Sequence, residues 1–580
     1  MQQLYLIVGT LLACHGLYLF IQRRIRCRTL PPKFWTWDPI MNFDWIFSCA
    51  FNATVQNSLF AKYGSTYRLP KLTTPMATIV TCHPENVYTI TAGKDWGIEF
   101  RKDGMGEMLG SGFICTDGAE WLRSRKMLRP AFNRPNIDNF DVLEGVASDI
   151  IKQIEKANGS VDMGLLLYDA LMHSSMHFIL GLDSTEKGDG RPMDAQQFNK
   201  LWQQGVLGMG LRLLLGGPVS KWLLPKARYT QVCNSLHSFI DFAIEKEETK
   251  VHQSDRKAKS MAEIVSPQAK DRADGRSQLM QTMLASQDTT GVLTCNVIQI
   301  LSTHPDRWSK LREEVLTAGP ELMTWDGLRE NKTIQNILSE TLRIRPVFPQ
   351  TGRYAIRDTI IPSGGGPNHD EPLPVPKGTF GISNAWGIHV NKDIYGPDAD
   401  EWRPERWNTV KPTNKEFVPF GIGPRACLGK DKALAEAAYL LARLVQRFES
   451  LEDKTGVWKP EASFSMKNKA GYKVAFKVPQ ITIMQYSADE DNYTTRPERP
   501  SLFMSVIRAE SRKITYCELN QLLETKFTIS PSVLFLATAL IYQRASNWAP
   551  YQLRNCTEAI KRADPPSKLI IRRDLCNYHR

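Results

Sequence analysis

The sequence lacks the patterns that mark several classes of protein. Its 11 cysteines are an odd number, are scattered from Cys14 to Cys576 and form no CxxC pair. We therefore expect neither a disulfide framework nor a structural zinc site, and a reducing compartment for the bulk of the chain. The net charge of +12 is spread along the chain rather than packed into one basic tract. This spread argues against binding of nucleic acid and favours an anionic membrane surface or an acidic protein partner.

Apolar runs long enough to span a bilayer are rare. Residues Val533–Tyr542 are apolar but too few, because a transmembrane helix needs about 20 residues. The run Leu4–Ile21 just suffices, and four arginines follow it, at positions 23, 24, 26 and 28. Basic residues stay on the cytoplasmic side, and a cleaved signal peptide would carry its charges before the apolar run. Residues 1–29 are therefore predicted to be an uncleaved transmembrane anchor with a basic flank.

The remaining chain contains no internal repeat and divides by character into two parts. Residues 30–479 are predicted to form one domain, mainly α with small β-sheets. Within it, the polar stretch Lys250–Arg276 is predicted to be a mobile surface connection, and the alternation in Gly471–Val478 indicates a closing strand. Residues 480–580 carry no motif with chemical meaning. This C-terminal extension has no assigned role, and a loosely ordered tail, a misassigned gene end and a regulatory tail all remain open.

The strongest chemical pattern is a glycine-rich loop around Cys427. Residues 420–429 read Phe-Gly-Ile-Gly-Pro-Arg-Ala-Cys-Leu-Gly. A cysteine thiolate can bind heme iron and donate electron density to it. Such a sulfur must stay deprotonated, and backbone N–H groups that point at it help to achieve this. We expect Gly423 and Gly429 to permit the tight turns that aim these groups.

The residues flanking Cys427 support the same interpretation. Phe420 can shield the sulfur from water, and Arg425 can pair with a heme propionate. Apolar residues at helical spacing from Leu434 to Phe448 predict a helix that begins just past the cysteine. The positive end of this helix would lie beside the sulfur and lower the pKa of the thiol.

The loop resembles the heme-binding loop of cytochrome P450 enzymes, and three further stretches resemble motifs of that family. These are Trp121–Arg125 (W-x-x-x-R), Glu340–Arg343 (E-x-x-R) and Arg403–Trp407 (Pro-Glu-Arg-aromatic). The resemblance covers about residues 33–479 and implies a single cytochrome P450-like domain that binds heme b, with the iron ligated by Cys427. Residues 358–366 and 389–407 look closest to the fungal branch that hydroxylates alkanes and fatty acids.

The resemblance also implies roles for individual residues. Glu340, Arg343 and Arg406 would form a buried structural triad beneath the heme. The residues expected at the heme propionates are Trp121, Arg125 and Arg425, with Arg353 as a further candidate after Pro349.

Residues 285–290, Ala-Ser-Gln-Asp-Thr-Thr, lie in a predicted helix between Leu279 and Leu301 and resemble the family's A-G-x-D-T-T motif. Oxygen activation needs a carboxylate and a hydroxyl that relay protons from solvent. Asp288 and Thr289 are the catalytic candidates. Ser286 departs from the motif, which has glycine there, and its hydroxyl could fill or narrow the groove for oxygen and water.

The resemblance implies that the chain is a monooxygenase in the endoplasmic reticulum membrane, with its catalytic domain facing the cytosol. Electrons would come from an NADPH-cytochrome reductase with an acidic docking face. Five basic residues are candidates for that contact: Arg123, Lys126, Arg129, Lys430 and Lys432. The apolar run Val206–Pro225 could line a substrate entrance at the membrane or form core helices.

A membrane-anchored P450-like enzyme suits a lipophilic substrate. An aliphatic chain such as a fatty acid or alkane, and a secondary-metabolite intermediate such as a polyketide or terpenoid, remain equally open. Two other function classes compete with a monooxygenase. A heme-thiolate isomerase or dehydratase would work without O2, and the Asp288–Thr289 pair argues against it. A heme or sterol carrier would need the loop but no chemistry.

Overall fold

The structure is a computed structural model that describes residues 30–478 apart from short gaps. The gaps are residues 36–37, 39–41, 43, 46–47, 50–53, 72–73, 139, 184–185, 187–188, 216–219, 221–225, 250–258 and 463–464. The chain divides into two units, Met1–Ile483 and Met484–Arg580. The second unit and the predicted anchor Leu4–Ile21 lie outside the described residues. Among the helices that are described, none has both the length and the apolar character needed to cross a bilayer.

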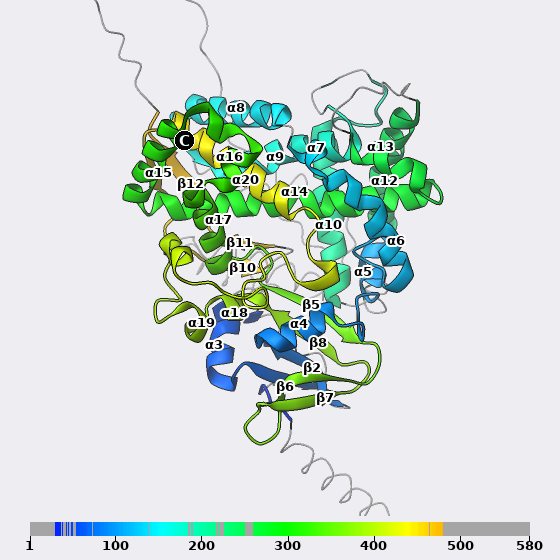
Figure 1. The fold of residues 1–580 in the computed structure, drawn as a ribbon. Helices are drawn as coiled ribbons and strands as arrows, with labels where there is room; N and C mark the ends of the chain where they lie inside the picture. Colours follow the sequence, from blue (N-terminus) through cyan, green and yellow to red (C-terminus); the bar gives the residue numbers. More distant parts are fainter. Residues whose placement is uncertain are drawn as a thin grey trace, which may run out of the picture. The chain divides into compact units, whose positions relative to one another are not determined.

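Helices make up most of the described part of the chain (Figure 1). They are α3 (Thr54–Tyr63), α4 (Pro84–Ala92), α5 (Arg101–Leu109), α6 (Gly118–Leu128), α7 (Arg134–Ile137), α8 (Asp141–Lys156), α9 (Met163–Ser175), α10 (Ala195–Leu215), α12 (Lys226–Thr249), α13 (Met261–Val265), α14 (Arg272–Ser302), α15 (Pro305–Ala318), α16 (Trp325–Glu330), α17 (Lys332–Ile344), α18 (Ala385–His389), α19 (Lys392–Tyr395) and α20 (Lys430–Arg447). Short 3-10 turns at η5 (Pro404–Asn408) and η6 (Gly423–Arg425) carry residues of the site described below.

The strands form small sheets, and within the described residues the largest has five strands in the order β1-β2-β8-β5-β3. Its strands are β1 (Thr66–Lys71), β2 (Thr74–Thr81), β3 (Trp96–Gly97), β5 (Gln350–Ala355) and β8 (Phe380–Asn384). The pair β2 and β8 is parallel, and the other pairs are antiparallel. The remaining strands are β4 (Ser160–Asp162), β9 (Leu451–Asp453) and β12 (Lys473–Phe476) in one sheet, and the hairpins β6 (Thr359–Gly365) with β7 (Glu371–Val375) and β10 (Pro460–Ala462) with β11 (Met466–Asn468).

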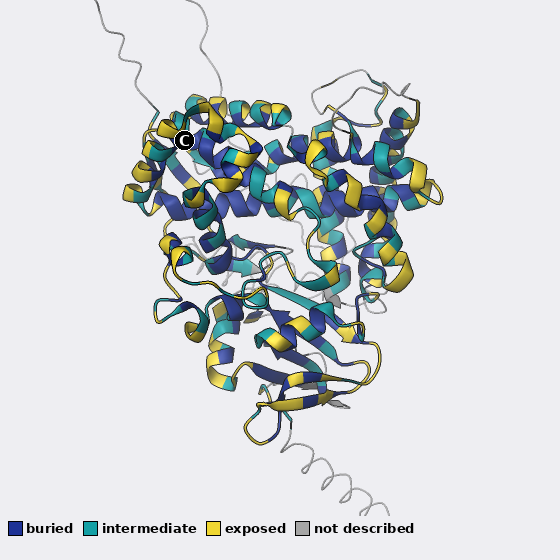
Figure 2. Ribbon diagram, in the orientation of Figure 1, coloured by how far each residue is buried: buried dark blue, intermediate teal, exposed yellow. Residues whose placement is uncertain are grey.

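Helix α14 is the central element of the helical part. The carboxylate of Asp271 accepts a hydrogen bond from the backbone N–H of Asp274 at 2.8 Å and so caps its first turn. The helix is buried along most of its length, as Figure 2 shows. A helix buried on nearly every side lies in the core of a large domain. It can therefore carry functional side chains into the interior on more than one face.

Two large hydrophobic clusters meet at α14. One joins it to α8, α9, α17 and α20, and the other joins it to α5, α10, α12 and α13. In Figure 1 these helices lie above the five-stranded sheet. The packing follows from apolar residues at helical spacing: α17 buries Ile334, Ile337, Leu338 and Thr341 on one side.

The predicted fold class is confirmed for the described residues, which are mainly helical with small sheets. The helix predicted to begin past Cys427 is present as α20, and the motif residues Trp121 and Glu340 lie on the helices α6 and α17. The alternating segment Gly471–Val478 contains β12, which pairs with β4 and β9. Periodicity therefore predicted α20 and β12, whereas the other motif segments were identified through the resemblance.

The prediction for the polar stretch Lys250–Arg276 was wrong in its second half. Residues 250–258 lie outside the described part, but the chain after them forms α13 and the start of α14. The Ser260 hydroxyl accepts from the backbone N–H of Glu263 at 3.1 Å, and Met261, Ala262 and Val265 are fully buried. These three apolar residues attach the short helix to the core although many charged residues surround them in the sequence. Burial depends on whether the apolar residues share one helix face, not on the average polarity of the segment.

Candidate active site

Cys427 lies in a loop that closes on itself just before α20. The backbone N–H of Cys427 donates to the carbonyl of Phe420 at 2.9 Å, and that of Ala426 donates to the carbonyl of Gly423 at 3.0 Å. From α6, the guanidinium of Arg125 donates to the carbonyl of Ala426 at 3.0 Å. These bonds fix the direction of the sulfur relative to α6 and α20.

Two glycines allow the loop to bend. Gly421 and Gly423 have φ values of 71° and 78°, which side chains other than glycine rarely adopt. A Cβ on Gly423 would also lie 2.4 Å from the Cβ of Ala92 in α4. Gly429 lies in the turn that leads into α20, as predicted, but its φ of −90° is one that other residues also adopt. Its backbone N–H donates to the Cys427 sulfur.

The surroundings of Cys427 differ from those of the other described cysteines. Its side chain is exposed, whereas Cys49, Cys115, Cys233 and Cys295 are buried. Desolvation by the surrounding protein nevertheless raises the pKa of the Cys427 thiol, and the Gly429 N–H, Arg125 and Lys430 act in the opposite direction. The thiol is therefore accessible to a ligand although much of the surrounding space is occupied by protein.

Arginines gather around Trp121 on the neighbouring α6. The guanidinium carbons of Arg125 and Arg425 lie 5.8 and 4.5 Å from the Trp121 ring centre. Arg425 donates to the carbonyl of Thr116 at 2.7 Å and to the carboxylate of Asp117 at 2.6 Å. Trp121, Arg125 and Arg425, which the sequence predicted to act together, are therefore neighbours in space.

Two further arginines add positive charge to this group. Arg353, on β5, is 7% exposed, and its Nε atom has no hydrogen-bond partner among the described residues. Burial, with the charges of Arg425 and Arg101 beside it, lowers the pKa of Arg353 to about 9. Burial also lowers the pKa of Arg101, at the start of α5. It lowers the pKa of Arg425 to about 10. Asp117 is the acidic group among these arginines, so the cluster has an excess of positive charge.

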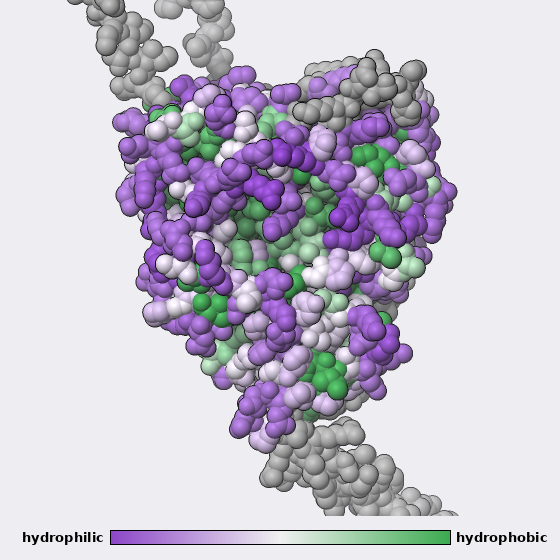
Figure 3. Space-filling view, in the orientation of Figure 1, coloured by the Kyte–Doolittle hydropathy of each residue, from purple (hydrophilic) through white to green (hydrophobic). Residues whose placement is uncertain are grey.

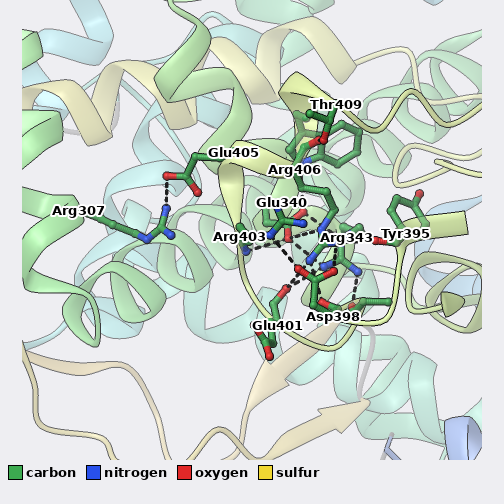
Figure 4. Close-up of polar contacts among 12 residues, drawn as sticks. Arg307, Glu340, Arg343, Tyr395, Asp398, Glu401, Arg403, Glu405, Arg406 and Thr409 are labelled. Atoms are coloured by element: carbon green, nitrogen blue, oxygen red, sulfur yellow. Dashed lines mark hydrogen bonds and ion pairs between the residues drawn. The ribbon is translucent and has the colours of Figure 1, made fainter.

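Glu340, Arg343 and Arg406 form the triad that the sequence predicted, and all three are fully buried. Arg343 donates from two nitrogens to both carboxylate oxygens of Glu340, at 2.8 and 2.9 Å, and Arg406 donates to the same carboxylate at 3.2 Å. Figure 4 shows the three groups gathered at one point, with the ion pair of Arg307 and Glu405 apart from them. A bidentate pair of this kind compensates charge that would otherwise be costly to bury.

Backbone carbonyls and a second carboxylate complete the triad. Arg343 donates to the carbonyl of His389 at 2.7 Å, and Arg406 donates to the carboxylate of Asp398 at 2.7 Å. Trp407 donates from its indole N–H to Glu340 at 3.1 Å. The triad therefore binds α17 to η5 and to the segment leading to the Cys427 loop.

Asp288 and Thr289, the predicted catalytic pair on α14, have different hydrogen-bond partners. The hydroxyl of Thr289 donates to the carbonyl of Ala285 at 2.8 Å within the helix. The carboxylate of Asp288 forms an ion pair with Lys467 and accepts from the hydroxyl of Ser465. Ser286 shares a hydrogen bond of 3.2 Å with Ser175 on α9. Its hydroxyl therefore has a partner between the two helices.

Comparison with known proteins assigns this arrangement to a family. The family model for Cytochrome P450 matches residues 31–476. "Cytochrome P450 monooxygenase FPY7" of Fusarium mangiferae is 30% identical over 73% of this chain and 83% of that protein. "Cytochrome P450 52E1" of Candida apicola is 31% identical over 64% and 76%, and "Cytochrome P450 monooxygenase himC" of Aspergillus japonicus is 32% identical over 69% and 74%.

The chain belongs to the cytochrome P450 family. It is a monooxygenase, and these relatives are fungal proteins, as the resemblance in the sequence implied. Cytochrome P450 enzymes carry a heme whose iron is bound by a cysteine thiolate. They receive electrons from a redox partner and act on lipophilic substrates.

The residues of the site fit a P450 heme. The two propionates of heme are anionic, and the arginine cluster offers a surplus of positive charge with an unpartnered donor at Arg353. An exposed thiol with a backbone N–H aimed at it fits iron ligation. Trp121, Arg125, Arg353, Arg425 and Arg101 would hold the propionates.

Replacing Arg353 by glutamine is expected to weaken heme retention about ten- to a hundredfold. A charge-assisted hydrogen bond contributes about 1.5–3 kcal/mol. Unfolding of the heme-free protein should be no easier than in the wild type, because the buried Nε atom of Arg353 has no hydrogen-bond partner there and burial disfavours its charge. Heme transfer to an acceptor protein measures the first effect and urea titration the second. Arg357→Gln is the matched control, since Arg357 is exposed and pairs with Asp95. Equal heme loss from both variants would contradict this role for Arg353.

Several residues near the site were missed from the sequence. Arg101 belongs to no P450 motif that the sequence displayed, and only the fold brings it to Arg353 and Arg425. Ser465 and Lys467 follow Asp288 by more than 170 residues. Ser465 lies directly before β11 and Lys467 within it, and their partner could not be inferred without the topology.

The basic residues predicted for docking of a reductase are only partly available. Lys432 is 8% exposed, forms an ion pair with Glu436 and lies over the Phe178 ring. It was therefore wrongly predicted as a surface contact. Arg123 pairs with Asp274 at 2.6 Å. Lys126, Arg129 and Lys430 are exposed and remain candidates.

Proposed function

We propose that this cytochrome P450 hydroxylates an aliphatic position of a lipophilic substrate, with electrons from an NADPH-cytochrome reductase. The arginine cluster together with an accessible thiol carries the proposal, because it provides partners for both the propionates and the iron of a heme. When bound, the heme supplies the chemistry that splits dioxygen. A fatty acid or alkane, and a polyketide or terpenoid intermediate, are the two substrate classes.

The chain's own residues have distinct tasks in this proposal. Cys427 binds the iron, and the N–H of Gly429 supports its negative charge. Phe420, which packs partly against the largest hydrophobic cluster, shields the sulfur from water. Asp288 and Thr289, on α14, would hold protons and pass them on to the oxygen substrate. Glu340, Arg343 and Arg406 keep the segment before the loop in place.

Apolar surface inside the protein supports a lipophilic substrate. Figure 3 shows hydrophobic residues gathered in a hollow at the centre of the visible face, surrounded by hydrophilic ones. Sites for small molecules are concave and mostly apolar. Such a hollow binds a substrate by removing apolar area from water rather than by charge.

Membrane attachment is also part of the proposal. The predicted anchor, residues 1–29, would place the enzyme in the endoplasmic reticulum membrane with the catalytic domain, residues 30–479, in the cytosol. Helix α10 supports this, because Leu207 and Leu211 are exposed one turn apart on it while Met209 is buried. Exposed apolar residues on one helix face suit a membrane contact near a substrate entrance.

The test is expression of the full chain in microsomes together with a reductase. The reduced protein should give the carbon monoxide spectrum of thiolate-bound heme. Lipid substrates of both classes should then yield a hydroxylated product that depends on NADPH and contains one oxygen atom from labelled dioxygen. Product formed without NADPH or reductase would identify an isomerase or dehydratase instead. A correct spectrum with no product from either class would overturn the substrate assignment.

A further inference from the structure

The hairpin of β10 and β11 holds both oxygens of the Asp288 carboxylate. The ammonium group of Lys467 pairs with Oδ1, and the hydroxyl of Ser465 donates to Oδ2. A carboxylate held at both oxygens cannot rotate, so its orientation on α14 depends on β11. Ser465 directly precedes β11 and Lys467 lies within it, so two residues on the same arm of the hairpin supply both contacts.

The base of this hairpin is tied to α14 independently. The Tyr472 hydroxyl donates to the side-chain oxygen of Asn296 at 3.1 Å and accepts from the backbone N–H of Asn468 at 3.1 Å. The backbone N–H of Met466 donates to the carbonyl of Val347 at 2.9 Å. Asn296 lies eight residues after Asp288, or about 12 Å along the helix. The hairpin is therefore attached to α14 at two separate points.

The two attachments differ in exposure. Tyr472, Asn296 and Met466 are 5% exposed or less. The side chains of Lys467 and Asp288 are 38% and 16% exposed. Water can reach the ion pair and compete with it, so it opens far more easily than the buried attachment. Lys467 also lies over the ring of Tyr168 on α9, at 5.9 Å, which limits where its ammonium group can go.

We propose that Lys467 and Ser465 are positioning residues that hold Asp288 at the solvent end of its proton path to Thr289. This inference rests on the proposed function. In the closed pair, Asp288 is fixed beside Thr289 on the same helix. When the pair opens, the carboxylate can take up a proton from solvent on the hairpin side and return with it. The contacts from the hairpin therefore control the rate at which Asp288 delivers protons to Thr289.

The test compares Lys467→Gln with Lys467→Arg, which keeps the charge, and with Lys477→Gln as the matched control. Lys477 also pairs with a glutamate, Glu449, but both side chains are more than half exposed. Lys467→Gln should lower the electron share, which is the fraction of the electrons consumed from NADPH that appear in hydroxylated product, by severalfold. It should also increase the solvent deuterium isotope effect on product formation. Lys467→Arg should restore most of that share, and Lys477→Gln should match the wild type.

A second measurement needs no turnover. Amide hydrogen exchange over residues 460–468 in the resting, heme-loaded enzyme should become several times faster in both Lys467→Gln and Asp288→Asn. Adding Lys467→Gln to Asp288→Asn should change neither exchange nor the electron share further, because the partner is already gone. Unchanged electron use in Lys467→Gln, or full additivity in the double variant, would overturn the inference. A wild type without the thiolate spectrum or without NADPH-dependent product would instead overturn the proposed function.

Discussion

Replacing Glu340 by glutamine is expected to destabilise the folded protein by about 3–5 kcal/mol. The carboxylate faces two fully buried guanidinium groups, those of Arg343 and Arg406. Glutamine has nearly the same shape but no charge, and its amide nitrogen cannot accept the hydrogen bond that the second oxygen accepts from Arg343. The buried positive charges would then lack compensation. Because whole domains are stable by about 5–15 kcal/mol, most of the protein should fail to accumulate in soluble form.

Glu405→Gln provides the control for this prediction. Glu405 pairs with Arg307 on the surface, where its side chain is 50% exposed (Figure 4). Pairs of this kind contribute about 0–1 kcal/mol. Urea unfolding of both variants, followed by tryptophan fluorescence, measures the difference. Near-equal midpoints for the two variants would show that the triad does not support the fold.

The triad shows how far a local motif can predict a site. The spacing of Glu340 and Arg343 placed them on one helix face, and the resemblance supplied Arg406. Asp398 was not predicted, although it accepts from Arg406 at 2.7 Å and from Arg403 at 2.8 Å. The hydrogen bonds from these two arginines hold the pKa of Asp398 well below its usual range. Aspartates in loops are common in any sequence, so only the path of the chain shows that this one has a role.

Contacts between distant segments were the part that the sequence could not predict. Asp288 was a candidate because it lies in a helical motif, and its position on α14 agrees with that. Its partners lie on a hairpin of short strands, whose register depends on packing of Met466 against Trp386 and Trp458. Nothing in a three-residue strand distinguishes its two faces before that packing is known.

The same limit applies to charge. Lys432 seemed a surface lysine because it follows the Cys427 loop among other charged residues. In the folded protein the Glu436 carboxylate, one helical turn later, pairs with it, and Ser174 donates to that carboxylate at 3.1 Å. Residues at i,i+4 are neighbours on a helix whether or not that face of the helix is buried. The sequence alone therefore did not reveal that this pair is buried.

Replacing Cys427 by alanine is expected to abolish the carbon monoxide spectrum of thiolate-bound heme and all NADPH-dependent product. Only the sulfur of this residue can serve as the iron ligand from the loop, since its neighbours Ala426 and Leu428 carry no donor atom. The fold should survive, because Cys427 is exposed and its removal leaves no cavity in the core. The free energy of unfolding without heme should stay within about 1 kcal/mol of the wild type.

Cys82→Ala is the matched control for the loss of a thiol. Cys82 is only partly buried and packs beside the sheet against Gly387 and Phe60 rather than in the loop. This variant should keep the full spectrum. If Cys427→Ala also kept the spectrum, another side chain would have to bind the iron. The arginine cluster around Trp121 would then hold a propionate of a heme that this other residue orients. Because the Gly429 N–H and the Arg125 guanidinium are both directed toward the Cys427 loop, the geometry predicts that no such substitute exists.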